Sequence, residues 1–133
     1  MKPTSKKSVK KSSGRYEAYQ GNMVYFNSTA KADRYLQLVQ FVGDKLITDL
    51  ELNPELPIVV NNVRITNYIA DFRYVTLEPN NHRGYAVIES VVGATTDTYK
   101  LKKRLAEVTY GIKINTIPAK EIEEWKEIIP LNQ

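Results

Sequence analysis

One aspartate lies inside an aromatic and apolar run near the middle of the chain, and this run constrains the fold more than any other stretch. Residues 68–74 read Tyr-Ile-Ala-Asp-Phe-Arg-Tyr, with Asp71 at the centre. The β-branched run of residues 86–93, which ends on a glycine, is its expected neighbour in a sheet. A carboxylate inside a strand is costly unless it is exposed, paired or used. The pattern therefore predicts a sheet built around Asp71 and makes this aspartate the first candidate functional residue.

The size and composition predict one globular domain. The chain has 133 residues, of which 42% are hydrophobic and 26% charged. No apolar run approaches the roughly 20 residues that cross a bilayer, and the N-terminal residues lack the apolar segment of a secretory signal. We therefore expect a cytoplasmic protein that does not enter membranes. The absence of cysteine excludes disulfides, thiolate zinc sites and a thiol nucleophile.

The net charge of +4 is unevenly distributed along the chain. The first 15 residues contain no acid and six cations, which are Lys2, Lys6, Lys7, Lys10, Lys11 and Arg15. The remaining residues hold 13 basic and 15 acidic side chains, a net charge of −2. We expect residues 1–15 to be a flexible basic tail and residues 16–133 to be the domain. The tail is either a solvated leader or an arm that neutralises phosphates.

The first half of the domain reads as a helix followed by strands. Asn27 or Ser28 offers the N-cap of a helix that ends at Gly43. The apolar side chains expected on its buried face are Ala32, Tyr35, Leu36 and Val39. Three or four strands are predicted to follow, within residues 46–52, 56–60, 63–76 and 85–92. The Asn61-Asn62 pair predicts a hairpin turn between the second and third of these strands.

The second half reads as helix, strand and helix. Thr95, Thr96 or Asp97 offers the N-cap of a helix that ends at Gly111. Its expected buried stripe is Leu101, Leu105 and Val108, and its remaining surface carries Lys100, Lys102, Lys103 and Arg104. Residues 112–117 alternate as a strand, and a last helix from Pro118 places Ile122, Trp125 and Ile129 on one face. The order α-β-β-β-α-β-α predicts an α/β fold, a central mixed sheet with helices on its faces and a parallel crossover.

This order, with a carboxylate on the second or third strand, resembles the PD-(D/E)XK nuclease superfamily. More closely, it is similar to a small phage-associated family of uncharacterised proteins placed in that superfamily. The resemblance covers roughly residues 25–117 and is carried by Phe26-Asn-Ser28, Ala32, Arg34-Tyr35-Leu36, residues 47–54, residues 68–74, Val91-Val92-Gly93, Asp97 and Tyr99-Lys-Leu-Lys-Lys103. It implies a single restriction-endonuclease-like domain that works on nucleic acid in the cytoplasm of an infected host cell.

The resemblance also implies an active site that this chain has largely lost. Active members hold Mg²⁺ with at least two carboxylates and place a lysine beside it. Carried over residue by residue, the first acid is Asp71, but the second acid and the lysine fall on Ser90 and Val92. A glutamate of the first helix falls on Lys31. The resemblance therefore implies a protein without catalysis and without a resident cofactor.

Two interpretations of Asp71 stay open. In the first, Asp71, Glu89 and Lys100 form a relocated active site in which Asp71 binds Mg²⁺. Strand alternation points Glu89 to the opposite face from Ser90 unless a bulge intervenes. In the second, Asp71 pairs with Lys31 or an arginine. His82, the only histidine, is either a metal ligand or general base, or an exposed turn residue.

For function, we expect binding of nucleic acid through two basic groups. The residues are Lys6, Lys7, Lys10, Lys11 and Arg15 in the tail and Lys102, Lys103 and Arg104 on the second helix. One alternative is an interaction module that docks on a host or virion protein. Another is an active Mg²⁺-dependent DNA endonuclease that uses the relocated residues.

Overall fold

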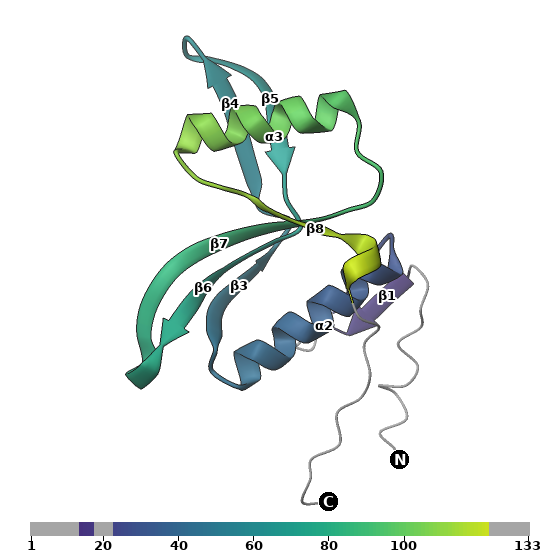
Figure 1. Cartoon of the computed structure of the whole chain (residues 1–133), viewed down its shortest axis with the longest axis vertical. Helices are drawn as coiled ribbons and strands as arrows, with labels where there is room; N and C mark the ends of the chain where they lie inside the picture. Colours follow the sequence, from purple (N-terminus) through teal and green to yellow (C-terminus); the bar gives the residue numbers. More distant parts are fainter. Residues whose placement is uncertain (1–13, 18–22, 123–133) are drawn as a thin grey trace, which may run out of the picture.

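The computed structural model of the chain describes residues 14–17 and 23–122, and has an α/β fold with a mixed central sheet (Figure 1). The strands are β1 (Gly14–Glu17), β2 (Met23–Phe26), β3 (Ile47–Leu52), β4 (Glu55–Val60), β5 (Val63–Ile69), β6 (Phe72–Glu78), β7 (His82–Val92) and β8 (Asn115–Pro118). The helices are α2 (Thr29–Gly43) and α3 (Asp97–Tyr110), with 3₁₀ turns η1 (Pro79–Asn81) and η2 (Ala119–Glu121).

Three predicted features fall partly or wholly outside the described residues. The expected boundary between tail and domain, at residues 15–16, falls within β1. The tail cations before Gly14 lie outside the described residues, as does most of the predicted last helix, of which the turn η2 is described. Within the described ranges, the structure has no helix of the length and apolar character needed to cross a membrane.

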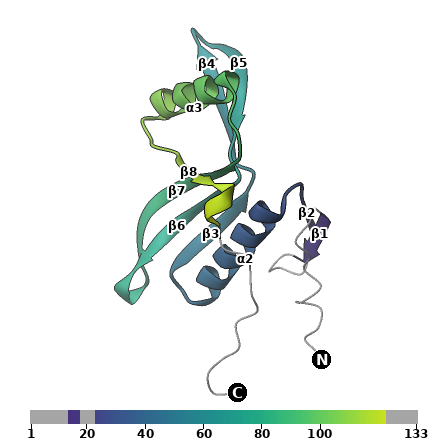
Figure 2. The same ribbon diagram turned by 45° about the vertical axis from the view of Figure 1, so that its right-hand side comes forward.

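Helix α2 begins and ends as the sequence predicts and covers the four-stranded sheet (Figure 2). The Ser28 hydroxyl accepts a hydrogen bond from the backbone N–H of Lys31 at 3.1 Å, which caps the first turn. The buried face of α2 includes Tyr35 and Leu38, which pack in a cluster with Phe26 and Phe72. This cluster fixes α2 against β6, which follows Asp71, and against β7, which carries Glu89.

The predicted strand over residues 63–76 was wrong, because the chain breaks there into β5 and β6. The two halves pair with different strands, β5 with β4 and β6 with β3. The segment that pairs with these strands is broken as well, between β3 and β4. Asn53 has a positive φ of 54° there and Pro54 has no backbone N–H, so this segment cannot continue as one strand either. Two hydrogen bonds close this joint, from Asn53 N to Asp71 O at 2.9 Å and from Ala70 N to Pro54 O at 3.1 Å. Asp71 therefore lies at a bend between two strands rather than inside one.

The central sheet has the strand order β3-β6-β7-β8. Strands β6 and β7 are antiparallel, with Phe72 opposite Glu89, so the expected neighbour of the aspartate run is confirmed. Strand β8 runs parallel to β7 after the α3 crossover, also as predicted. It pairs with residues 89–92 of β7. Among the described residues, no strand lies beside the same edge of β7 over residues 82–88.

Helix α3 lies across the β4–β5 hairpin, and its capping was predicted correctly. Thr96 is the N-cap, and Gly111 ends the helix in the left-handed conformation with φ of 65°. The predicted buried stripe was wrong at Leu101 and Val108, which are 60% and 64% exposed. Leu105 packs against a second core cluster, and the small Ala106 allows close approach of the helix to Ile58 and Tyr68 in that cluster. Periodicity located an apolar face, but only the fold decides which face is covered.

Candidate functional site

A cavity of about 320 Å³ lies beside Asp71, where α2, the strand joint, the end of β7 and the start of α3 meet. Its lining includes Lys31, Asp71, Ser90, Val92 and Tyr99. A second hollow of about 350 Å³ shares Tyr99 with the first and is also lined by Lys102. The positions that the resemblance assigns to catalysis are therefore brought to one place, and the next hollow carries one of the expected basic residues.

Both oxygens of Asp71 are engaged. Its Oδ1 lies 3.1 Å from the Lys31 Nζ, and its Oδ2 accepts a hydrogen bond from the Val91 N–H at 2.7 Å. The bend after Ala70 turns the carboxylate of Asp71 toward α2. Lys31 lies in the first turn of this helix. The interpretation that Asp71 pairs with Lys31 is confirmed. An ammonium group thus neutralises the one carboxylate that this cavity contains among the described residues.

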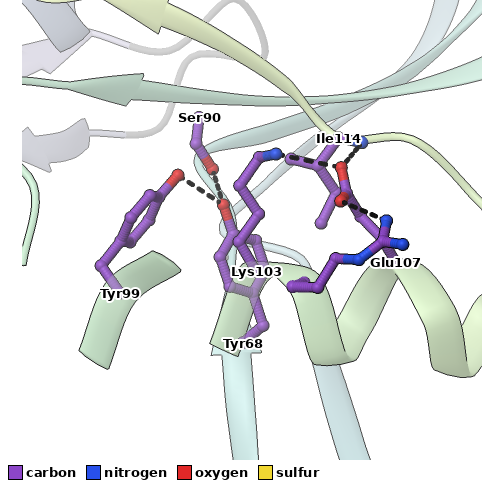
Figure 3. A network of polar contacts seen from close by, with 7 residues as sticks. Tyr68, Ser90, Tyr99, Lys103, Glu107 and Ile114 are labelled. Atoms are coloured by element: carbon purple, nitrogen blue, oxygen red, sulfur yellow. Dashed lines mark hydrogen bonds and ion pairs between the residues drawn. The ribbon is translucent and has the colours of Figure 1, made fainter. Parts of the chain in front are cut away.

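Ser90 is buried in a chain of three hydroxyls (Figure 3). Its Oγ lies 2.5 Å from the Tyr68 Oη, which lies 2.9 Å from the Tyr99 Oη. Burial raises the pKa of the Tyr68 phenol far above its usual value, so this ring stays neutral at physiological pH. The position expected to carry the second acid therefore holds a neutral hydroxyl that is already hydrogen-bonded.

Glu89 points to the other face of β7, as strand alternation predicts. It is 1% exposed and forms two bonds with Arg34, from Nε to Oε1 at 2.9 Å and from NH2 to Oε2 at 2.7 Å. The Tyr74 hydroxyl also donates to Oε2. Burial by itself lowers the pKa of Arg34, but the hydrogen bond and the charge of Glu89 outweigh it and raise that pKa. Burial and Glu89 also raise the pKa of Tyr74, so the Tyr74 hydroxyl stays protonated and donates to Glu89.

The structure does not bring the proposed relocated residues together. Asp71 lies in the cavity, while Glu89 is enclosed on the α2 side of the sheet. Lys100 is exposed and is not among the residues that line either hollow. In the described part of the chain, no group of three or more His, Cys, Asp or Glu side chains is arranged to hold a metal ion. His82 is exposed at the start of β7.

The three cations expected on the second helix have different surroundings, and two of them lie near the same carboxylate. Lys102 lines the second hollow. Lys103 Nζ lies 3.0 Å from the Glu107 Oε2, which also accepts the Ile114 N–H at 2.9 Å (Figure 3). Arg104 is 75% exposed and lies 3.9 Å from the other oxygen of Glu107. These residues therefore do not form one basic face.

Sequence reasoning missed the partners of the buried charges. Arg34 was named only among the residues of the resemblance, yet an arginine on the buried side of α2 needs a carboxylate, and this was the available signal. Tyr68 and Tyr74 lie three residues to either side of Asp71, and each places a hydroxyl at a different face of β7. Residues six apart on one strand would share a face, so their spacing did not indicate this arrangement.

Comparison of the chain with protein-family models, with curated proteins and with solved structures finds no match.

Proposed function

We propose that this chain is a phage-type nuclease-fold protein that has lost catalysis and binds nucleic acid in the cytoplasm of an infected cell. The ion pair between Lys31 and Asp71 is the observation that carries the proposal. A divalent cation needs several oxygen ligands, but here an ammonium group is paired with the carboxylate, and both side chains line the cavity. Ser90 and Val92 add no charged ligand and no general acid or base.

Two features support nucleic acid as the partner. Lys102 and Tyr99 line the same hollow and offer a cation for a phosphate and an aromatic ring for a base. The tail cations add a sequence-independent attraction for the phosphate backbone. The body itself is slightly acidic, so we assign most of the affinity to the tail and the positioning to Lys102.

A titration against salt tests the binding. We expect the full chain to bind single- or double-stranded oligonucleotides with an affinity that falls steeply as salt rises. Replacing Lys6, Lys7, Lys10 and Lys11 by Gln should abolish most of it, and Lys102→Gln should weaken it about three- to tenfold and reduce the salt slope by about 0.9. Lys120→Gln, an exposed cation on η2, is the matched control and should change little. Binding that does not depend on salt, or no binding, contradicts the proposal.

A gain-of-function variant tests the loss of catalysis. We expect no Mg²⁺- or Mn²⁺-dependent cleavage of plasmid, branched or single-stranded DNA by the natural chain. The triple variant Lys31→Glu, Ser90→Asp, Val92→Lys restores the residue types that the resemblance requires, and activity should arise only there. Cleavage by the natural chain that disappears in Asp71→Ala would instead establish an active enzyme.

A protein-interaction module is the second candidate, and the tip of the β4–β5 hairpin favours it. Val59, Val60, Val63 and Ile65 are 44–59% exposed there, and exposed apolar groups mark contact sites when they are contiguous. This candidate predicts that a purified host or virion protein binds the chain after nuclease treatment. It also predicts that Val60→Thr with Val63→Thr prevents that binding.

A further inference from the structure

The outer face of α3 carries an apolar stripe that the rest of the described structure leaves uncovered. Leu101 and Val108 lie seven residues apart on one side of the helix and are 60% and 64% exposed. Leu105, between them, is half-buried and packs against the second core cluster, so the uncovered part of the stripe is Leu101 and Val108. The opposite side of the helix carries Ala106 and Glu107, which are buried against the hairpin and the loop before β8. The stripe therefore faces away from the β4–β5 hairpin, on which α3 packs.

The charges around the stripe define what fits it. Arg104 lies between Leu101 and Val108 in the helical repeat, and Lys100 lies one turn before Arg104; both are exposed. Asp97 is the acid at the start of the same face. A second α3 would place like charges against one another. An acidic amphipathic helix would match both the apolar stripe and its cations.

We propose that this face binds the C-terminal segment, residues 123–131, of a second copy of the chain. The segment reads Glu-Glu-Trp-Lys-Glu-Ile-Ile-Pro-Leu and contains three glutamates against one lysine. Trp125 and Ile129 lie four residues apart, which is the spacing of one helical face. The charge and the apolar spacing of the segment are thus complementary to those of α3. The inference does not depend on the proposed binding of nucleic acid.

The path of the chain favours a second copy over the same copy. Strand β8 carries the chain away from α3 to η2, and Ala119 and Ile122 pack against the α2 core cluster. Figures 1 and 2 both place η2 beside α2, in the other half of the molecule from α3 and the β4–β5 hairpin. The segment therefore starts on the side of the molecule that α3 does not occupy.

Mixing two complementary full-length variants tests the proposal. Leu101→Asn with Val108→Thr removes the receiving face, and Trp125→Ala removes the anchor of the segment. After nuclease treatment, we expect each variant alone to be monomeric by analytical ultracentrifugation, and their mixture to form a heterodimer with one intact contact. Trp125 is the only tryptophan of the chain, so in the mixture its emission should shift to shorter wavelength as the partner variant is added.

Charge reversal provides the second measurement. Arg104→Glu should weaken self-association of the full chain at least tenfold, and adding Glu124→Arg to it should recover part of that loss. Ile65→Thr, another exposed apolar residue, is the control and should leave association unchanged. The proposal would be overturned if the natural chain stayed monomeric or if the two variants did not associate when mixed. It would also be overturned if the Trp125 emission wavelength did not change when the partner variant was added.

Discussion

Lys31 and Arg34 lie one turn apart on α2, and each neutralises a carboxylate on a different side of the sheet. Arg34 meets Glu89 in a nearly dry environment, with two guanidinium bonds and a tyrosine hydroxyl. Lys31 meets Asp71 at the mouth of a cavity, where both side chains keep some exposure. The first pair fixes α2 on the sheet. The second lies where a ligand could reach it, which is why the proposed function rests on Lys31.

The Arg34–Glu89 contact allows a sharp stability prediction. Arg34→Met should lower the free energy of unfolding by about 3–5 kcal/mol, because it leaves a buried carboxylate without a counter-charge. Arg73→Met is the matched control, since its partner Glu51 is about as exposed as Arg73 itself, and such pairs contribute at most about 1 kcal/mol. Urea unfolding at pH 7 measures both. Equal losses would show that Glu89 is not held as a buried ion.

At the scale of single elements, Glu107 connects α3 to the loop before β8. Burial by itself raises the pKa of Glu107, but the bonds from the Ile114 N–H and Lys103 outweigh it and lower the pKa below 4.5. Between the lowered pKa and 4.5 the unfolded chain binds more protons than the folded one. The ionised Glu107 carboxylate thus stabilises the folded chain at neutral pH. This stabilisation is lost as the pH falls through the pKa that Glu107 has in the folded chain.

Replacing this residue should therefore change the pH dependence of stability. Glu107→Gln should cost about 1–3 kcal/mol at pH 7, and its difference from the natural chain should shrink as the pH falls below 4.5. Urea midpoints measured at several pH values give this difference directly. Glu51→Gln, on an exposed pair, should show almost none of it. A constant difference across the pH range would mean that Glu107 titrates as in the unfolded chain.

Most elements could be predicted from local chemistry, and the failures have a common cause. Ser28, Thr96 and Gly111 act as caps through bonds within a few residues, so the sequence shows them. The break at Ala70 and Asp71 escaped prediction because its cause, Asn53 and Pro54, lies on the paired strand. The orientation of α3 escaped prediction because a small residue, rather than the largest apolar ones, faces the hairpin.

At the scale of the whole molecule, strand β7 contributes residues from its two faces to two cores. Val91 belongs to the cluster under α2, together with Phe72 and Tyr74 of β6, and Ile88 belongs to the cluster under α3, together with Ala70 of the strand joint. The α/β class, the strand pairing and the parallel crossover could be predicted because they follow from element order. The division into two cores could not, since it depends on which face of β7 each helix covers.

Because both cores include residues of β7, we expect them to unfold together. Ile58→Ala, in the cluster under α3, should destabilise the molecule by about 2–5 kcal/mol. Native-state hydrogen exchange should then show the same loss of protection in the most protected amides of α2 as in those of α3. Unchanged protection in α2 would mean that the two cores unfold independently.

The short strand β8 has a consequence for how the protein behaves when concentrated. Among the described residues, no strand pairs with the outer edge of β7 over residues 82–88, so its backbone donors and acceptors could pair with an extended segment of another molecule. An unpaired strand edge is a template for fibril growth unless a bulge or another irregularity interrupts its regular backbone geometry. The register shift between Val75 and Leu77 is a local irregularity of this kind, and Gly84 opposite it leaves no room for a larger side chain beside Thr76. Within the described residues, this irregularity rather than a covering strand is therefore expected to hinder pairing along the edge.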